Sequence, residues 1–502
     1  MLLQSASNLL HESPLLVFST AIFLLLVMQV VRDLFINPLT KYPGPWFAGA
    51  SRIPQLYHTF KGDLIHWVTS LHVAYGDVVR VAPDELSYAS GDAWKGIYGH
   101  AAVGKKVTEK DTRFYGPSFN GAPDIIRANG PDHSRFRRNF SHAFSDRALR
   151  DQQSLICNYV DMLVETLKAK IKKDSKEKVN MVRMFNLTTF DIMGDLTFGD
   201  SLDLLLGTGD TNWVSAVFSS MKTNALRRLG RYWPWTAFIA QNFIPRVLKQ
   251  QAIAHYKASQ ARVDKRIDHN PDLKKPDIWG IVMNQKEDLR LSRTEMYANS
   301  QVFMVAGTET TATTLSGLLY NLLMKPETMD KIVEEILDTF EKDSDIEMRP
   351  LEHMKYLNAC IEEALRVYPP VPVGLPRITP DDGLLICGKH VPGKTAVSVN
   401  QWATYHSPKN FKHADDFIPE RWIDSEFASD NKASFQPFSF GPRNCLGRNL
   451  AYHEMRLILA KVLYNFEFTL VPESIGWEKQ NTFFLWEKNE LVVQLKVREA
   501  RR

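Results

Sequence analysis

A single cysteine near the C-terminus has the surroundings of a metal ligand. Residues 438–447 read FSFGPRNCLG and place Cys445 between Gly441 and Gly447, directly before a helical pattern. Thiolate is the form of cysteine that binds metals, and loop amides and a helix N-terminus both stabilise its negative charge. The two glycines would also let the backbone approach a flat cofactor. We therefore predict that Cys445 binds a metal. The other cysteines are typical of inert buried residues: Cys157, Cys360 and Cys387.

A threonine-rich stretch interrupts a long helical pattern over residues 294–323. Residues 306–311 read AGTETT, and further threonines follow at once. Glycine and threonine both cost helix stability relative to alanine, and threonine hydroxyls compete for backbone carbonyls. Such a helix can be distorted for function, or it can use small residues for tight packing. The composition of the stretch leaves both interpretations open.

A carboxylate and a guanidinium three residues apart form a third candidate. Glu363 and Arg366 lie at i and i+3 of the predicted helix 351–367, on one face. A glutamate and an arginine at this spacing usually form a solvent-exposed pair on the helix surface. A proline-rich stretch follows at residues 369–376, and a further arginine, Arg421, lies in the later segment PERW.

Together these segments resemble the cytochrome P450 family. Residues 438–447 match the family's haem-binding pattern F-x-x-G-x-R-x-C-x-G at every fixed position. The resemblance implies that Cys445 is the proximal ligand of the iron in haem b, and that Arg443 pairs with a haem propionate. Phe438 and Gly447 belong to the same cofactor-binding loop.

The remaining motifs gain roles from the same resemblance. Glu309 and Thr310 resemble the acid–alcohol pair of the family's distal helix, which relays protons during O₂ activation. Glu363, Arg366 and Arg421 resemble a buried network that braces the haem loop. The run HSRFRR resembles a helix bearing W-x-x-x-R, with histidine in the tryptophan's place. It and the segment after the prolines supply further propionate candidates: His133, Arg137 and Arg377.

The elements that must position these residues are mainly helical. Helical periodicity dominates from residue 51 onward, for example over residues 154–170, 294–323, 328–340 and 351–367. Short strand-like runs lie at residues 78–81 and 396–399. There is no alternating series of strands and helices. We predict a mostly α fold with minor β structure, a single large cytochrome P450-like haem domain behind one N-terminal transmembrane helix.

The N-terminus predicts a membrane anchor. Residues 15–31 carry no charge and would span roughly 26 Å as a helix, close to the hydrocarbon thickness of the endoplasmic reticulum. A cleaved signal peptide and a buried core helix are the alternatives, but no small-residue cleavage site follows. Arg32 and Lys41 lie after the run, which favours a cytosolic domain. The expected order is a lumenal N-terminus (1–14), an anchor (15–31), a proline-rich linker (32–50) and a cytosolic haem-thiolate domain (51–502) in the endoplasmic reticulum membrane.

Composition and charge indicate which classes of partner the protein has. The chain has 502 residues, 44% hydrophobic and 24% charged, which excludes a disordered chain or a disulfide scaffold. A net charge of +4 over this length gives no reason to expect nucleic acid. No flavin domain or nicotinamide fingerprint is present, so the resemblance implies electrons from NADPH-cytochrome P450 reductase. We expect it to dock on basic residues among Arg127, Arg135, Arg138 and Arg448.

The predicted substrate is a lipophilic small molecule. The expected lining, at residues 114–125, 302–310, 371–375 and 482–484, is mostly apolar and aromatic. No cation or carboxylate stands out as an anchor. The basic and aromatic run at residues 228–245 suits a membrane interface, with a core helix rim as the alternative.

The resemblance to the family indicates the reaction class, and a resemblance to its fungal members indicates the class of substrate. Residues 75–83 and 141–145 resemble filamentous-fungal members, many of which modify terpenoid, polyketide or alkaloid skeletons in secondary metabolism. We therefore expect a monooxygenase. The alternatives are an oxygen-independent isomerase or dehydratase, a desaturating oxidase, and a non-catalytic haem sensor.

Overall fold

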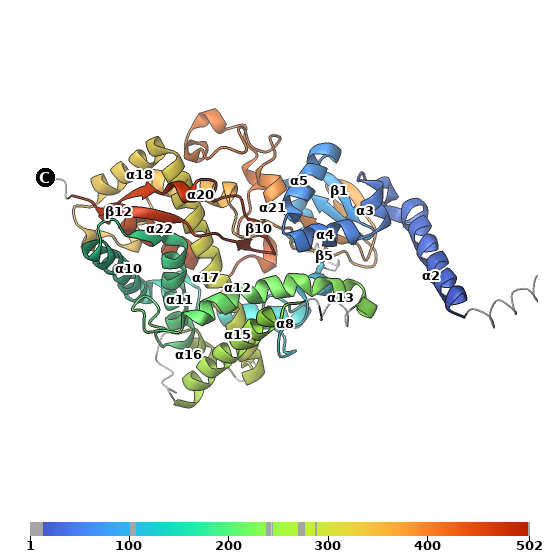
Figure 1. The fold of residues 1–502 in the computed structure, drawn as a ribbon, viewed down its shortest axis with the longest axis horizontal. Coiled ribbons are helices and arrows are strands. Elements are labelled where there is room, and N and C mark those ends of the chain that lie inside the picture. Colours follow the sequence, from blue (N-terminus) through green and yellow to red (C-terminus); the bar gives the residue numbers. More distant parts are fainter. Residues whose placement is uncertain are drawn as a thin grey trace, which may run out of the picture.

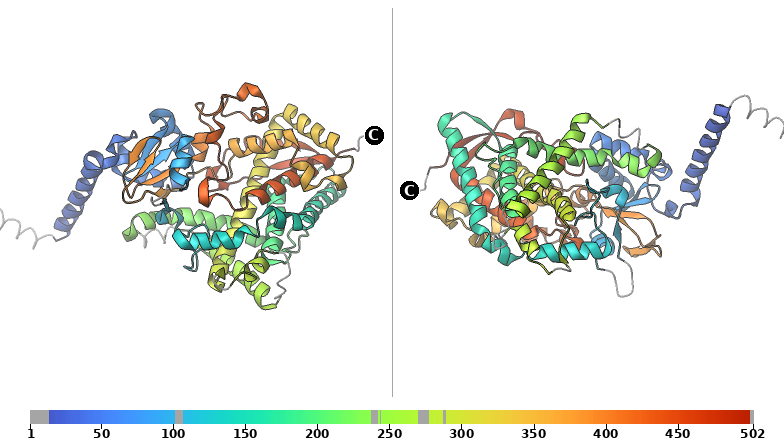
Figure 2. Two further views of the ribbon diagram at one scale, coloured as in Figure 1. Left: turned by 180° about the vertical axis from the view of Figure 1, so that it is seen from behind. Right: turned by 90° about the horizontal axis from the view of Figure 1, so that it is seen from below.

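An isolated apolar helix leads into the folded body. The computed structural model describes residues 14–499 except 101–106, 237–241, 243, 270–276 and 287–288. Helix α2 (Pro14–Val31) projects from one side of the molecule in all three views (Figures 1 and 2). Among the described residues, one helical segment is long and apolar enough to cross a membrane, Leu15–Ile36, and none of its apolar window is buried. The expected lumenal segment lies almost wholly outside the described residues.

The proline-rich segment after α2 is fixed to the body. It forms a π-helical turn (Arg32–Ile36), a 3₁₀ turn (Pro38–Lys41) and helix α3 (Trp46–Ala50). The Arg80 N–H donates to the carbonyl of Pro43 at 2.8 Å. A Cβ on Gly44 would lie 2.5 Å from the Arg80 carbonyl oxygen, so glycine permits this close approach. The segment is therefore an elbow held against strand β1 (Val78–Ala82).

A small mixed sheet forms the part of the body next to the elbow. Its strand order is β1-β2-β8-β5-β3. Strand β2 (Glu85–Tyr88) pairs in parallel with β8 (Ala396–Val399), in the register Glu85↔Ala396. Strand β5 (Arg377–Ile378) pairs antiparallel with both β8 and β3 (Glu109–Lys110). The sheet thus brings segments far apart in the sequence together, and it delivers Arg377 beside Lys110.

Helix α17 (Arg293–Met324) crosses the centre of the helical body (Figure 1). A capping box fixes its start, because the Ser292 hydroxyl accepts from the Glu295 N–H while the Glu295 carboxylate accepts from the Ser292 N–H. It packs extensively against α11 (Met181–Phe198) and also against α15, α20 and α22. A Cβ on Gly307 would lie 2.5 Å from the Met193 sulfur. This glycine therefore lets α11 approach α17.

The other helices surround α17. They are α4 (Ile53–Lys61), α5 (Leu64–Tyr75), α6 (Asp92–Tyr98), α7 (Thr112–Tyr115), α8 (Gly130–Ser141), α9 (Asp146–Asp151), α10 (Gln153–Lys173), α12 (Thr211–Leu226), α13 (Arg228–Tyr232), α15 (Arg246–Asp264), α16 (Ile278–Met283), α18 (Pro326–Thr339), α19 (Met348–Leu351), α20 (Lys355–Val367), α21 (Gln401–Tyr405) and α22 (Arg448–Asn465).

Three smaller sheets complete the fold. Their strands are β4 (Lys178–Asn180), β12 (Val492–Val497) and β9 (Phe466–Leu470); β6 (Leu384–Ile386) and β7 (Lys389–Val391); and β10 (Asn481–Thr482) and β11 (Trp486–Glu487). The prediction of a mostly helical domain with minor β structure is confirmed. One predicted helix begins late: residues 352–354 form a turn between α19 and α20.

Candidate active site

Cys445 lies between a short 3₁₀ turn (Gly441–Arg443) and the start of α22. Its backbone N–H donates to the Phe438 carbonyl at 2.8 Å, which closes the loop. Its side chain is exposed, yet enough protein surrounds the thiol for burial to raise its pKa. A hydrogen bond from the Gly447 backbone and the charge of Arg137 act in the opposite direction. A side chain that is both accessible and enclosed faces a space inside the fold.

The two glycines of the cysteine loop, Gly441 and Gly447, differ in whether the fold requires a glycine at their position. Gly441 has φ +74°, and a Cβ there would lie 2.0 Å from the Tyr98 carbonyl oxygen. A Cβ on Gly447 would make only an ordinary contact with Phe144, at 3.8 Å. We expected both glycines to make room for a cofactor. The positive φ of Gly441 and its contact with the Tyr98 backbone already require glycine there, whether or not a cofactor approaches. Only Gly447 has open space beside it.

Four cations and a histidine gather around this loop. Arg137 donates to the Asn444 carbonyl and to its Oδ1 at 2.5 and 2.6 Å, and Arg443 donates to the Ala128 carbonyl at 2.6 Å. Burial, and then the charges of the cations, lower the pKa of His133 to about 3. In the described part of the chain, no carboxylate is ion-paired with any of these cations, Lys110, Arg137, Arg377 and Arg443.

The cluster has unused donors. Arg377 is 3% exposed, and its Nε and Nη1 have no hydrogen-bond partner among the described residues. Lys110 is also buried, and burial together with the charges of Arg377 and Arg443 holds its pKa well below the ordinary lysine range. Buried unpaired cations are costly unless an anion joins them. The site therefore fits a group that carries carboxylates, as haem does.

Helix α17 presents a short accessible face within the core. Ala306 is exposed and Thr310 is half-buried, whereas Met304 and Thr308 beside them are fully buried. The Thr310 hydroxyl donates to the Ala306 carbonyl at 2.7 Å. Residues four apart share one helix face, so this face also borders an interior space. The Thr310 hydroxyl oxygen is therefore accessible at that surface, while its proton is donated to Ala306.

Glu309 is bonded to Lys488, whereas the sequence analysis grouped it with Thr310. It is 1% exposed and forms an ion pair with Lys488, whose side chain is 2% exposed. Lys488 also donates to the Thr313 hydroxyl at 2.7 Å, and Thr313 donates to Glu309 at 3.2 Å. Burial raises the pKa of Glu309, while the charge of Lys488 opposes this shift. The acid is thus held by Lys488, which directly follows β11 and which the sequence analysis missed.

The three residues of the proposed bracing network are fully buried and in contact. Arg366 donates to Glu363 from Nε and Nη2 at 3.0 and 2.7 Å, and Arg421 Nε donates to Glu363 at 2.9 Å. Trp422 Nε1 also donates to Glu363, at 2.9 Å, and Arg421 Nη1 donates to Asp430 at 2.7 Å. Glu363 therefore joins α20 to the segment that precedes the cysteine loop, and the surface-pair alternative is excluded.

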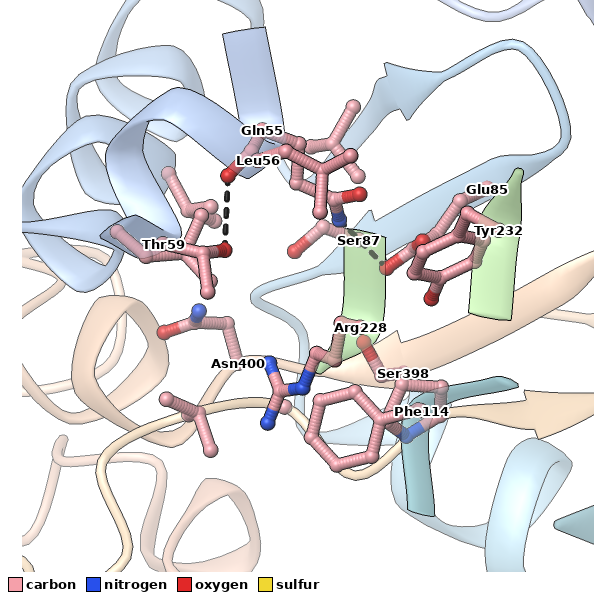
Figure 3. A pocket seen from close by; sticks show the side chains of 16 residues that line it. Gln55, Leu56, Thr59, Glu85, Ser87, Phe114, Arg228, Tyr232, Ser398 and Asn400 are labelled. Carbon is pink, nitrogen blue, oxygen red and sulfur yellow. Dashed lines mark hydrogen bonds between the residues drawn. The ribbon is translucent and has the colours of Figure 1, made fainter. Parts of the chain in front are cut away.

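A pocket lies between α4, the small sheet and α13 (Figure 3). Phe114, Val373 and Gly374, which the sequence analysis placed in the substrate lining, border it. Arg228 and Tyr232 line it as well.

Two arginines of the run at residues 228–245 face the protein interior rather than a membrane surface. Arg228 is buried, and Arg231 donates to the carbonyls of Arg113, Phe114 and Asn224. Two aromatics of this run, Phe238 and Phe243, lie outside the described residues. The expectation that three cysteines are buried is confirmed for Cys360 alone, since Cys157 is half-buried and Cys387 is exposed.

Comparison with known proteins identifies the class to which this fold and site belong. The model of the cytochrome P450 family matches residues 48–495, so the chain is a member of that family. The resemblance read from the motifs is confirmed. The family implies a haem-iron cofactor, a redox partner and a small-molecule substrate.

Its relatives are fungal cytochrome P450 monooxygenases. The chain is 47% identical over 475 residues to cytochrome P450 monooxygenase efuB of Hormonema carpetanum, with 94% of each chain covered. It is 43% identical to astA of Talaromyces wortmannii, over 94% of this chain and 95% of the relative. It is 39% identical to astJ of Aspergillus oryzae, over 94% of this chain and 95% of the relative. The chain is therefore a cytochrome P450 monooxygenase.

Proposed function

We propose that this protein is a membrane-anchored haem-thiolate monooxygenase that inserts one oxygen atom from O₂ into a lipophilic fungal secondary metabolite of the terpenoid, polyketide or alkaloid class. The observation that carries this proposal is the cysteine loop. An accessible thiol lies beside a cluster of cations that have no carboxylate partner within the described residues. An iron porphyrin needs both features, a thiolate for the metal and cations for its propionates.

Separate groups of residues would bind the iron and the propionates of haem b. Cys445 would ligate the iron, with Phe438 and Gly447 shaping its loop. Arg137, Arg377, Arg443 and His133 would hold the propionates, and we add Lys110 to this set. The bound haem would supply the redox chemistry with O₂, which no side chain of the protein can perform.

Thr310 and Glu309 would manage protons on the distal side. The Thr310 hydroxyl borders the accessible face of α17 and donates its proton to the Ala306 carbonyl, so rotation of the hydroxyl would turn that proton toward the open face. Glu309 lies one residue earlier, and among the described residues its carboxylate is bonded to Lys488 and Thr313 and not to that hydroxyl. Proton transfer from Glu309 therefore requires its side chain to rotate or a water to bridge the two groups. Lys488 sets the resting position of the acid.

Electrons would come from NADPH-cytochrome P450 reductase, with α2 holding this protein at the endoplasmic reticulum membrane. Of the four arginines predicted to dock it, two have acidic partners, since Arg127 pairs with Asp124 and Arg135 pairs with Glu295. Arg138 and Arg448 are exposed. We therefore assign docking mainly to these two. Reversing both charges should reduce turnover driven by the reductase and spare turnover driven by peroxide, and an equal loss of both would contradict the assignment.

The reaction class is tested with isotopically labelled oxygen gas. Membranes that carry this protein and a reductase are given NADPH and a pooled extract of host metabolites, and products are identified by mass spectrometry. One labelled oxygen atom in a new product supports monooxygenation. Consumption of a metabolite without label would favour desaturation, dehydration or rearrangement instead.

A further inference from the structure

Arg228 is a buried cation whose side chain has no hydrogen-bond partner among the described residues. It opens α13, is 5% exposed, and lies with its guanidinium carbon 3.9 Å from the centre of the Phe114 ring. Its Nε is buried with no partner among the described residues. Figure 3 shows the guanidinium inside the pocket, between Phe114 and Asn400. An arginine stays charged at neutral pH, so this position holds a positive charge away from bulk water.

The carboxylates nearby are already paired with other groups. Glu85 accepts from Gln55 at 3.0 Å and from Arg52. Asp111 accepts two hydrogen bonds from the Arg113 side chain, at 3.0 and 2.9 Å, and Asp84 accepts from both Arg113 and Arg52. Arg52 and Arg113 therefore donate hydrogen bonds to all three carboxylates, and among the described residues none of the three accepts a hydrogen bond from Arg228.

Two further donors face the same pocket. Asn400 uses its Oδ1 to cap α21, by accepting from the Ala403 N–H at 2.9 Å. In the part of the chain that the structure describes, its amide nitrogen forms no hydrogen bond, and neither does the hydroxyl of Ser398. Both residues line the pocket with Arg228. A guanidinium, an amide and a hydroxyl that converge without an acceptor form a site for an anion.

The pocket adjoins the region assigned to the cofactor. Val373, Gly374 and Pro376 line it, and the next residue, Arg377, belongs to the cation cluster around the cysteine loop. The charges that act on the cluster member His133 are those of Arg443, Lys110, Arg137 and Arg377, whereas Arg228 is influenced by Tyr232, Glu85, Tyr115 and Asp111. Tyr115 lies within electrostatic reach of Arg228 and also of Arg377 and Arg443, so the anion site neighbours the propionate site.

We propose that Arg228, with Asn400 and Ser398, binds a carboxylate of the substrate, so that this enzyme acts on a lipophilic acid. The apolar skeleton would extend past Phe114 and Val373 toward the haem, and the carboxylate would fix which carbon is presented. The proposal rests on the proposed function for the identity of the occupant as substrate. It replaces the expectation that the pocket has no ionic anchor.

Matched pairs of an acid and its methyl ester test the proposal. Oleic acid with methyl oleate, and abietic acid with methyl abietate, are titrated calorimetrically into the full-length holoenzyme in nanodiscs. Wild type is compared with Arg228→Met, Arg228→Lys and the exposed neighbour Arg227→Met. Partition into the nanodisc is common to all variants, so the acid-to-ester affinity ratio is compared between them. Acetate serves as a plain anion, and the thermal midpoint reports folding.

We expect at least one acid to bind wild type about tenfold or more tightly than its ester, as a charge-assisted hydrogen bond provides. Arg228→Met should bring that ratio to about one and leave ester binding unchanged, Arg228→Lys should keep part of it, and Arg227→Met should keep all of it. Acetate should not bind at the same concentrations.

The opposite results would overturn the proposal. These are equal binding of acids and esters to wild type, an acid preference that survives Arg228→Met, no acid binding at all, or acetate binding as tightly as the long acids. The readout needs no turnover. An enzyme that keeps the acid preference but incorporates no oxygen label would refute the proposed function alone.

Discussion

Replacement of Lys488 by methionine tests the role of the buried pair on α17. Lys488 and Glu309 are 2% and 1% exposed, so the substitution leaves a carboxylate in the core without its cation. The carboxylate keeps only the hydrogen bond from Thr313. Removing one partner of a buried ion pair costs about 3–5 kcal/mol, because the remaining charge has lost both water and its counterion.

The expected shift in thermal midpoint follows from the size of the chain. An unfolding entropy of about 2.1 cal/mol/K per residue over 502 residues gives roughly 1 kcal/mol per degree. The midpoint of Lys488→Met should therefore fall by about 3–5 °C. A surface pair on β12 provides a matched control. Lys496 is 68% exposed beside Glu467, so Lys496→Met should change the midpoint by less than about 1 °C.

The loss should depend on pH with a definite sign. Burial already raises the pKa of Glu309, and removal of Lys488 raises it further. A carboxyl whose folded pKa exceeds its unfolded value favours the folded state when protonated, and this contribution is lost as pH rises through the folded pKa. The deficit of Lys488→Met should thus be smaller at about pH 5.5 than at about pH 8. Differential scanning calorimetry of the holoenzyme at both values measures this.

A double variant completes the test. Glu309→Gln in the Lys488→Met background removes the stranded charge and should recover at least half of the lost stability. A midpoint for Lys488→Met within about 1 °C of wild type, or no recovery in the double variant, would refute the reasoning that the two groups form a buried charged pair.

Three further predictions follow from the site. Thr310→Ala removes the hydroxyl at the accessible face of α17, so product per NADPH should fall about tenfold or more while released peroxide rises; unchanged coupling would exclude a proton role. Lys110→Met and Arg377→Met should each increase the rate of haem transfer to apomyoglobin, because each loses a propionate donor, and a rate equal to wild type would remove that residue from the cluster. Arg366→Met should yield little folded holoenzyme, because it breaks the fully buried ion pair with Glu363, at a cost of about 3–5 kcal/mol. A normal yield would show that the network does not brace the loop.

The sequence predicts best what depends on local pattern. Strand β8 occupies the predicted residues 396–399, and α17 extends one residue beyond the predicted 294–323 at each end. The cysteine loop is also local, because its glycines and the start of α22 lie within a few residues of Cys445. Such features follow from backbone conformation and hydrophobic period, which a short window of sequence contains.

The residues that the sequence analysis missed depend on distant contacts. Lys488 meets Glu309 across 179 positions of the chain. Lys110 reaches the cation cluster because β3 pairs with β5, a pairing of two-residue strands that leaves no periodic signal. Arg228 belongs to a run of arginines and aromatics that suits a membrane interface equally well, and only the fold shows that its side chain turns inward. No local pattern separates these lysines and arginines from solvated ones.

The central claim is that Cys445 is the thiolate ligand of haem iron. The most direct measurement is the carbon monoxide difference spectrum of the reduced holoenzyme, for wild type, Cys445→Ser and the exposed cysteine variant Cys387→Ser. We expect the strongly red-shifted Soret band of thiolate ligation in wild type and Cys387→Ser, and its absence in Cys445→Ser. The same band in Cys445→Ser would contradict the account.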